Sequence, residues 1–196
     1  SQTKQIAGHS CTVHDIALAR VAGVMPAEKT APDAGDFSTY EKITFTSGST
    51  GTAKGVRLSL TTLESTAQAI ATALQLLSIE SHLGVLPFAT LLENIAGLYA
   101  PLLQGVRIHV RSLAQLGLAS PEQFNPFLLL NEIQNVKPHA TILVPQLLLA
   151  LVSLRQRGMQ TGDSFRFIAV GGGKVASALL QQAQDFGLPV YEGYGL

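Results

Sequence analysis

The feature that most constrains the fold is a regular alternation of short apolar runs with longer segments of helical periodicity. The apolar runs lie at 42–46, 55–59, 83–88, 106–110, 140–144, 165–170 and 188–192, and helical patterns follow at 61–77, 92–105, 121–136, 145–157 and 174–186. Parallel strands require crossover connections, which are usually helices. The alternation therefore predicts an α/β fold, a mainly parallel sheet flanked by helices.

Proline and cap residues predict where the helices begin and break. Thr61 and Glu64 match a capping box, which would begin the first helix. Pro101 is expected to disturb the helix over 92–105, and Pro126 to interrupt the one over 121–136, because proline lacks a backbone donor. The apolar faces at 128–130 and 147–151 are predicted to form the core, with the wall of an acyl pocket as the alternative.

Composition and charge exclude several classes of protein. Of the 196 residues 46% are hydrophobic and 13% are charged, which is typical of a packed globular chain. The 13 basic and 13 acidic residues balance, so no nucleic acid or anionic membrane partner is indicated. Cys11 is the single cysteine, and neither a signal peptide nor a membrane-spanning segment is recognised. A cytoplasmic protein is expected, while its oligomeric state is not indicated.

The domain pattern separates a short leading region from the α/β part. Residues 1–39 are predicted to hold one amphipathic helix (12–23) and a linker rich in proline, alanine and aspartate (25–39). Residues 40–196 then form the front part of one domain. The last predicted strand is not followed by a closing helix, so we expect the domain to be incomplete at this end.

The stretch "ITFTSGSTGTAKGVRLS" (43–59) has the chemistry of a phosphate-binding loop. Its glycines permit close approach of an anion to successive backbone N–H groups, while hydroxyl side chains and Lys54 add further donors. A Walker loop is excluded because Lys54 lies between Ala53 and Gly55, and a nucleophile elbow because Ser47 occupies its first glycine position. A polar hairpin loop without a ligand remains the alternative.

A second glycine cluster, "GGGKVA" (171–176), follows a predicted strand and precedes a helix. It satisfies G-x-G-x-x-A, and Glu192 stands near the end of the next strand, where a dinucleotide-binding fold has its ribose-binding acid. An NAD-type oxidoreductase is therefore one alternative function. A tight strand-to-helix turn without any ligand is another interpretation of these glycines.

The remaining chemistry-bearing residues do not form a recognisable site. His9, Cys11, His14 and Asp15 cluster, but they lack the paired spacing of a zinc site, so no metal site is predicted. The isolated residues His82, His109 and His139 are expected to be structural, and no catalytic triad can be argued from their spacing.

The glycine-rich stretch "FTSGSTGTAKGV" closely resembles the phosphate-binding signature of the adenylate-forming superfamily of AMP-dependent synthetases and ligases. Later segments resemble that family in order: "LPFATLLENIAGLYAPLLQGV", "KPHATILVPQLLLAL" and "FIAVGGGKVASALLQQAQDFGLPVYEGYGL". The resemblance covers residues 40–196. The segment over 92–105 leans toward the fatty acyl-CoA synthetases within this superfamily.

The resemblance implies an activity and a set of site residues. An acid–thiol ligase of this kind uses ATP and Mg²⁺ to convert a carboxylic acid to an acyl-adenylate, which then passes its acyl group to coenzyme A. By position, the ATP phosphates would be held by Thr46, Ser47, Gly48, Ser49, Thr50, Gly51 and Lys54. The adenine and acyl pocket would be bordered by Gly171, Gly172, Gly173, Glu192, Gly193, Tyr194 and Gly195.

Departures from the family pattern accompany the resemblance. Ala53 stands where proline is usual, Leu60 follows Ser59 where histidine is common, and Ala89 and Thr90 replace a histidine or aromatic residue near the acyl site. The chain stops at Leu196, before the family's threonine–glutamate pair, ribose-binding aspartate and catalytic lysine. We therefore expect little activity from this part alone, with a non-catalytic nucleotide-binding protein as a further alternative. The catalytic residues stay unassigned.

Overall fold

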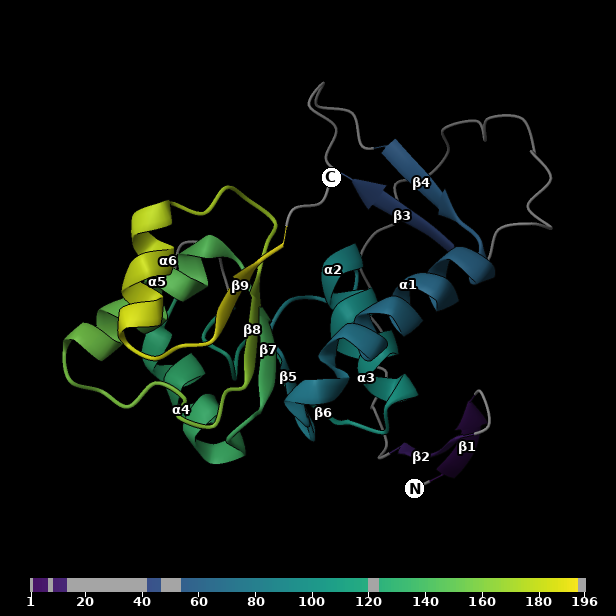
Figure 1. Cartoon of the computed structure of the whole chain (residues 1–196), viewed down its shortest axis with the longest axis horizontal. Helices are drawn as coiled ribbons and strands as arrows, with labels where there is room; N and C mark the ends of the chain where they lie inside the picture. Colours follow the sequence, from purple (N-terminus) through teal and green to yellow (C-terminus); the bar gives the residue numbers. More distant parts are fainter. Residues whose placement is uncertain (1, 7–8, 14–41, 47–53, 120–123, 194–196) are drawn as a thin grey trace. The chain divides into compact units, whose positions relative to one another are not determined.

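The computed structural model describes residues 2–6, 9–13, 42–46, 54–119 and 124–193. The chain divides into two compact units, Ser1–Leu63 and Glu64–Leu196. Each unit is described by itself, with the elements labelled as in Figure 1.

The first unit contains two antiparallel strand pairs. β1 (Gln2–Ile6) pairs with β2 (His9–Val13), and β3 (Lys42–Thr46) pairs with β4 (Lys54–Leu58). The β3–β4 pair agrees with the predicted strands to within one residue at each end. β1 and β2 were not predicted, and the helix expected over 12–23 is wrong at residues 12–13, which lie in β2. The rest of that segment lies outside the described residues.

Helix α1 (Leu60–Leu74) begins earlier than the capping pattern predicted and leads into the single turn η2 (Gln75–Leu77). Ser59 provides the cap, since its Oγ accepts a hydrogen bond of 3.2 Å from the backbone N–H of Thr62. The Thr61 cap is therefore wrong by two residues. Ala67 and Ala71, one helical turn apart, are buried, as the predicted apolar face requires.

The second unit is built on a five-stranded parallel sheet, which confirms the predicted fold class. The strand order is β6-β5-β7-β8-β9, and every pairing between neighbours is parallel. The strands are β5 (Ser81–Gly84), β6 (Arg107–Val110), β7 (Ala140–Leu143), β8 (Phe167–Val170) and β9 (Val190–Glu192).

Helices cover both faces of this sheet (Figure 1). One face carries α4 (Pro126–Val136), α5 (Pro145–Gln156) and α6 (Ser177–Asp185). The other carries α1 and a segment made of α2 (Leu91–Asn94), η3 (Ile95–Tyr99) and α3 (Ala100–Leu103). The chain leaves β5 toward β6 on one side and later returns past β5 to β7, so that β5 and β7 flank a topological switch point.

The hydrophobic core lies between the sheet and α4–α6. Strand residues such as Leu83, Leu143 and Ile168 are fully buried there. Helix residues from the two predicted core segments join them, namely Leu129, Leu147, Leu148 and Leu151. These segments therefore form core, as predicted, and are not the wall of an acyl pocket. Leu149 is 53% exposed because it lies on the opposite face of α5.

Of the two predicted proline effects, the interruption at Pro126 is wrong, whereas the disturbance of the helix at Pro101 is confirmed by a π-helical turn directly before it. Pro126 does not interrupt a helix but occupies the first turn of α4, where Asn125 Oδ1 accepts a 3.0 Å hydrogen bond from the N–H of Phe127. Pro101 lies in the first turn of α3, directly after η3, a π-helical turn. The wider turn lets the chain pass Pro101 without ending the helical segment, because a proline in a first turn needs no donor.

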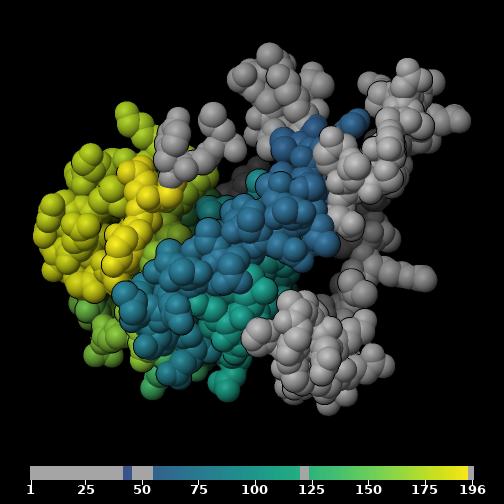
Figure 2. All heavy atoms as spheres, turned by 45° about the vertical axis from the view of Figure 1, so that its right-hand side comes forward, coloured from purple at the N-terminus to yellow at the C-terminus, as the bar shows by residue number. Residues whose placement is uncertain are grey.

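The space between the sheet and the α1–α3 face is almost filled. A cavity of about 20 Å³ remains there, lined mainly by small and apolar side chains including Ala71, Ala100, Ala140 and Phe167. This volume suffices for about one water molecule. In Figure 2 the outer surface of α1 forms a continuous ridge beside the α2–α3 segment, and Gln104 Nε2 of that segment donates a hydrogen bond to the carbonyl of Ala71.

Gly117 provides a test of the packing between the β6–α4 connection and α4. Its φ is +73°, and an added Cβ would overlap the carbonyl oxygen of Asn125, which directly precedes the helix. We expect Gly117→Ala to lower the free energy of unfolding by about 3 kcal/mol or more. Gly158→Ala is the matched control, since Gly158 has φ +81° with nothing within 4 Å and should lose only about 1–2 kcal/mol. Equal losses in urea denaturation would contradict the packing argument.

Candidate functional site

The glycine-rich loop connects the two strands of the β3–β4 hairpin. Thr46 and Lys54 are direct cross-strand partners in the last pair of the ladder, so the hairpin brings the two ends of the predicted phosphate-binding segment together. Residues 47–53 form the connection between them. The predicted phosphate contacts Ser47, Gly48, Ser49, Thr50 and Gly51 lie outside the described residues.

The second glycine cluster lies at the carboxyl edge of the parallel sheet. Gly171 follows β8 and continues its ladder, because its N–H donates a 3.1 Å hydrogen bond to the carbonyl of Leu143 at the end of β7. Gly172 has φ +79°, a conformation that favours glycine, and turns the chain away from the sheet toward α6. Gly173 is exposed in the same turn.

The predicted residues on β9 lie next to this turn. Glu192 is the register partner of Val170, the residue just before the glycines, and its side chain is exposed. The N–H of Gly193 donates a 2.8 Å hydrogen bond to the carbonyl of Val170. The structure thus places the two sequence-predicted groups on adjacent strand ends. Tyr194 and Gly195 lie outside the described residues.

Apolar side chains surround the glycine turn. An added Cβ on Gly171 would lie 3.0 Å from Leu92 Cδ2 of α2 and 3.4 Å from the carbonyl oxygen of Gly193. Two residues that follow β7 also lie close to the turn. A Cβ added to Gly172 would lie 3.5 Å from Val144 Cγ1, and one added to Gly173 would lie 3.6 Å from Pro145 Cγ. This edge is next to the β5–β7 switch point, the place where open parallel sheets bind their ligands. The groups that the described residues present around this turn are thus backbone and apolar side chains.

A buried ion pair near this edge was missed by the sequence analysis. His82 Nε2 of β5 lies 2.9 Å from Glu93 Oε1 of α2, and the two residues are 2% and 0% exposed. The sequence contains a signal for it, an acidic residue within the otherwise apolar pattern of "LLENIAGLY". His139 also has a protein partner, because its Nδ1 accepts a 3.1 Å hydrogen bond from the N–H of Glu80. These contacts agree with the predicted structural roles of both histidines.

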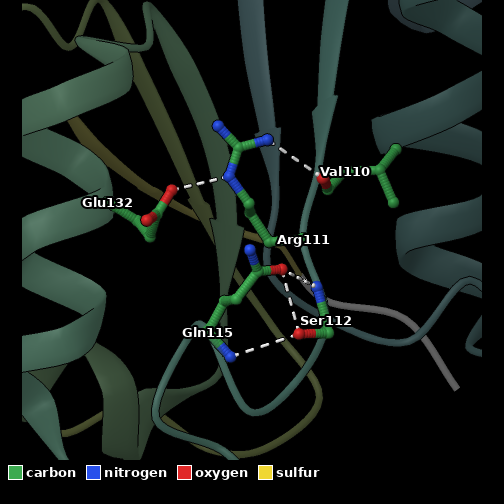
Figure 3. Close-up of polar contacts among 5 residues, drawn as sticks. All are labelled: Val110, Arg111, Ser112, Gln115 and Glu132. Carbon is green, nitrogen blue, oxygen red and sulfur yellow. Dashed lines mark hydrogen bonds and ion pairs between the residues drawn. The ribbon is translucent and has the colours of Figure 1, made fainter. Parts of the chain in front are cut away.

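A second ion pair holds the end of β6 against α4 (Figure 3). Arg111 Nε donates to Glu132 Oε2 at 2.6 Å, and its Nη1 donates to the carbonyl of Val110 at 3.1 Å. Beside them, Gln115 Oε1 accepts hydrogen bonds of 2.9 Å from both the N–H and the hydroxyl of Ser112. The polar groups of this cluster bond to one another, which explains their presence without a ligand. Together they stabilise the turn after the edge strand β6.

His109 on β6 lies in a cationic environment. Burial, followed by the positive charges of Arg111 and Arg107 and the proximity of His82, lowers the pKa of the His109 imidazole. Alternate residues of the edge strand β6 are thus cationic or can become so. Charge on an edge strand discourages pairing with a foreign strand.

No metal-binding cluster of three or more suitable side chains exists among the described residues. His9 and Cys11 lie on β2, whereas His14 and Asp15 fall outside the described part. None of the helices in the described ranges is long and apolar enough to cross a membrane.

Comparison with known proteins assigns the family. A model of the AMP-binding enzyme family matches residues 12–196, nearly the whole chain. The chain belongs to the AMP-binding enzymes, the adenylate-forming superfamily. This membership removes the NAD-type dehydrogenase alternative, which depended on the 171–176 glycines and Glu192.

Solved structures of AMP-binding enzymes share the fold. O-succinylbenzoate coenzyme A synthetase (MenE) from Bacillus subtilis, in complex with AMP, is 24% identical with a TM-score of 0.59 over 79% of this chain and 29% of that one. The N-terminal domain of FACL13 from Mycobacterium tuberculosis is 22% identical with a TM-score of 0.62, covering 79% and 36%. The anthranilate CoA ligase AuaEII with anthranoyl-AMP is 17% identical with a TM-score of 0.62, covering 79% and 28%.

The chain thus spans 28–36% of the length of these solved structures. No curated protein sequence gives a significant match to it. The matched part corresponds to a portion of the large domain of AMP-binding enzymes.

The lowered pKa of His109 predicts a pH dependence of stability. The unfolded chain binds this proton more readily than the folded protein does, so the free energy of unfolding should fall as the pH drops below the ordinary value of 6.5. His109→Gln should flatten that part of the profile and leave the stability at pH 8 nearly unchanged. Denaturant unfolding between pH 5 and pH 8 measures the free energy of unfolding of both proteins. If that free energy falls with decreasing pH as steeply in the variant as in the wild type, His109 is not the group responsible.

Proposed function

We propose that the complete protein containing this chain activates a carboxylic acid with ATP and transfers the acyl group to coenzyme A. The observation that carries the proposal is family membership across residues 12–196, together with the glycine-rich phosphate signature between β3 and β4. Because the chain spans about a third of the solved ligases or less, the activity is proposed for the complete protein.

The loop from Thr46 to Lys54 is proposed to bind the β- and γ-phosphates of ATP. Backbone N–H groups of a glycine-rich turn bind phosphate oxygens, and hydroxyl groups and a lysine add donors. The pairing of Thr46 with Lys54 supports this role, since it holds the hydroxyl-bearing and cationic ends of the segment side by side on the hairpin backbone.

The carboxyl edge of the sheet is proposed to border the adenine and the acyl group. Gly172, Gly173 and Gly193 expose backbone without side chains there, so a flat ring or an extended chain can approach closely, while Gly171 is buried against Leu92. Exposed Glu192 adds an acceptor at the end of β9, and Tyr194 and Gly195 continue the proposed pocket along the sequence.

The proposed reaction needs little covalent chemistry from these residues. A carboxylate oxygen of the acid attacks the α-phosphorus of ATP, the bond to the bridging oxygen breaks, and pyrophosphate leaves with the negative charge. A thiol of coenzyme A then attacks the acyl carbon and AMP departs. Fixed N–H groups and Lys54 would stabilise the charge that develops on the departing pyrophosphate.

Magnesium is proposed to bind together with ATP. This cation keeps several waters and binds mainly through substrate phosphates with one or two carboxylates. We assign no described side chain to it, because those residues contain no carboxylate cluster. A related solved structure, MenE from Bacillus subtilis, is described in complex with ATP and magnesium ion.

The acid is proposed to be apolar, in keeping with a fatty acid. Leu92, Val144 and Pro145 lie against the glycine turn, and these side chains offer no polar partner for a second carboxylate or an amine. Burying an unpaired charge beside them would cost free energy.

Lys54 provides a test of the phosphate-binding role. We expect Lys54→Gln in the complete protein to reduce acid-dependent ATP–pyrophosphate exchange about 100-fold, because a fixed donor to the developing charge contributes on this order. Lys137→Gln is the control, because it removes the same charge from an exposed lysine at the end of α4, far from Lys54 in the sequence.

The experiment distinguishes the proposed ligase activity, the role of Lys54 and the non-catalytic alternative. Exchange that needs an acid and fails only in the Lys54 variant supports the proposal. Equal rates in both variants would remove the assigned role of Lys54. ATP binding without exchange for any acid would favour the non-catalytic nucleotide-binding alternative.

Substrate polarity gives a separate test. With octanoate and succinate compared at equal concentration, kcat/KM for exchange should be higher for octanoate by about 10-fold or more, because burial of an unpaired carboxylate costs more than 1.4 kcal/mol. A preference for succinate would contradict the apolar pocket.

A further inference from the structure

The buried carboxylate of Glu93 is held by two contacts, one to each of its oxygens. Its Oε1 lies 2.9 Å from Nε2 of His82, and its Oε2 accepts a 3.3 Å hydrogen bond from the backbone N–H of Leu86. Both side chains are essentially inaccessible, Glu93 at 0% and His82 at 2%. A carboxylate without contact with water is stable only when its oxygens are hydrogen-bonded, and here both have partners.

Gly97 makes room for this pair. A Cβ at Gly97 would overlap Glu93 Oε1 and would lie 2.8 Å from His82 Nε2. Gly97 lies in the π-helical turn η3, one turn after Glu93. π-Helical turns inside longer helices are rare and occur frequently at functional sites. The helical distortion, the glycine and the buried pair thus form one local arrangement.

Glu93 and its neighbour Leu92 link the end of β5 to the glycine turn. Leu86 begins the loop that leaves the carboxyl end of β5, and the Glu93 carboxylate holds its N–H. The next residue back along α2, Leu92, has its Cδ2 3.0 Å from the position of a Cβ on Gly171. A shift of Glu93 would therefore move both the loop after β5 and the side chain that contacts the glycine turn.

We propose that Glu93 is a positioning residue for the choice of acid, because it fixes Leu92 where that side chain packs on the 171–173 turn. Because Glu93 is fully buried, it acts through Leu86 and Leu92 and does not touch the substrate itself. The inference rests on the proposed function, since it assigns the acyl group to the surroundings of this turn. Displacement of positioning groups by about 1 Å can cost up to about 100-fold in rate.

The experiment compares Glu93 variants in the complete protein. Glu93→Leu removes both hydrogen bonds at similar volume, and Glu93→Asp withdraws the carboxylate by one methylene so that the Leu86 bond breaks. Glu93→Gln retains an acceptor for Leu86 and a polar partner for His82. Glu132→Gln is the control, because it removes a carboxylate from the Arg111 ion pair on the other face of the sheet.

The expected result is a selective effect on the acid. In ATP–pyrophosphate exchange, Glu93→Leu and Glu93→Asp should raise the KM for octanoate about 10-fold or more, with the KM for ATP within about 3-fold of wild type. Glu93→Gln and Glu132→Gln should stay near wild type in both constants. Hydrogen exchange should show faster exchange of the Leu86 amide in the Leu and Asp variants alone, a readout independent of activity.

Other results overturn the inference in distinguishable ways. A fall in thermal stability without a change in the ratio of the two KM values would make Glu93 a purely structural residue, and if the Leu variant does not fold, the Asp variant decides by the same criterion. A parallel rise in both constants would also refute a role in acid selection. Wild-type protein without acid-dependent exchange would refute the proposed function, and the inference with it.

Discussion

The parallel sheet must be covered on both faces, and this requirement organises the second unit. Parallel strands can be joined only by crossovers, and right-handed crossovers that run in opposite directions along the sheet, β5 to β6 and then β6 to β7, place helices on opposite faces. The chain meets the requirement with α4–α6 on one face and α1–α3 on the other. As a consequence, every strand ends at the same edge, so the backbone after β5, β7, β8 and β9 converges there.

Convergence at one edge explains how residues from distant parts of the sequence become neighbours. Leu92 follows β5, Gly171 follows β8 and Gly193 follows β9. A Cβ added to Gly171 would nevertheless lie only 3.0 Å from Leu92 Cδ2 and 3.4 Å from the carbonyl oxygen of Gly193. None of the three needs a charged or nucleophilic side chain. Under the proposed function, an edge of this kind would bind by shape and by backbone groups, as a reaction that depends mainly on positioning and electrostatics requires.

The interior beneath this edge is not uniformly apolar. The buried His82–Glu93 pair lies there, and it coincides with the π-helical turn and with Gly97. Replacing such a pair by apolar residues is often neutral or stabilising in other proteins, so a contribution to stability alone is a weak reason for its presence. A role in positioning the loop after β5 and Leu92 accounts for all of these features together.

The sequence by itself determined the fold class, the order of strands and helices, the glycine clusters and the family resemblance, because these follow from local periodicity, backbone freedom and motif spacing. It predicted β3, β7 and α5 nearly to the residue, and it misplaced the roles of Pro126 and Thr61. Only the tertiary structure decided which strands are neighbours, that Gly171 meets Leu92, and that Glu93 finds His82 and Leu86. The first two depend on how distant segments pack, the Glu93 contacts depend on how the chain turns back after β5, and a periodic pattern carries no information about which partner a buried side chain meets.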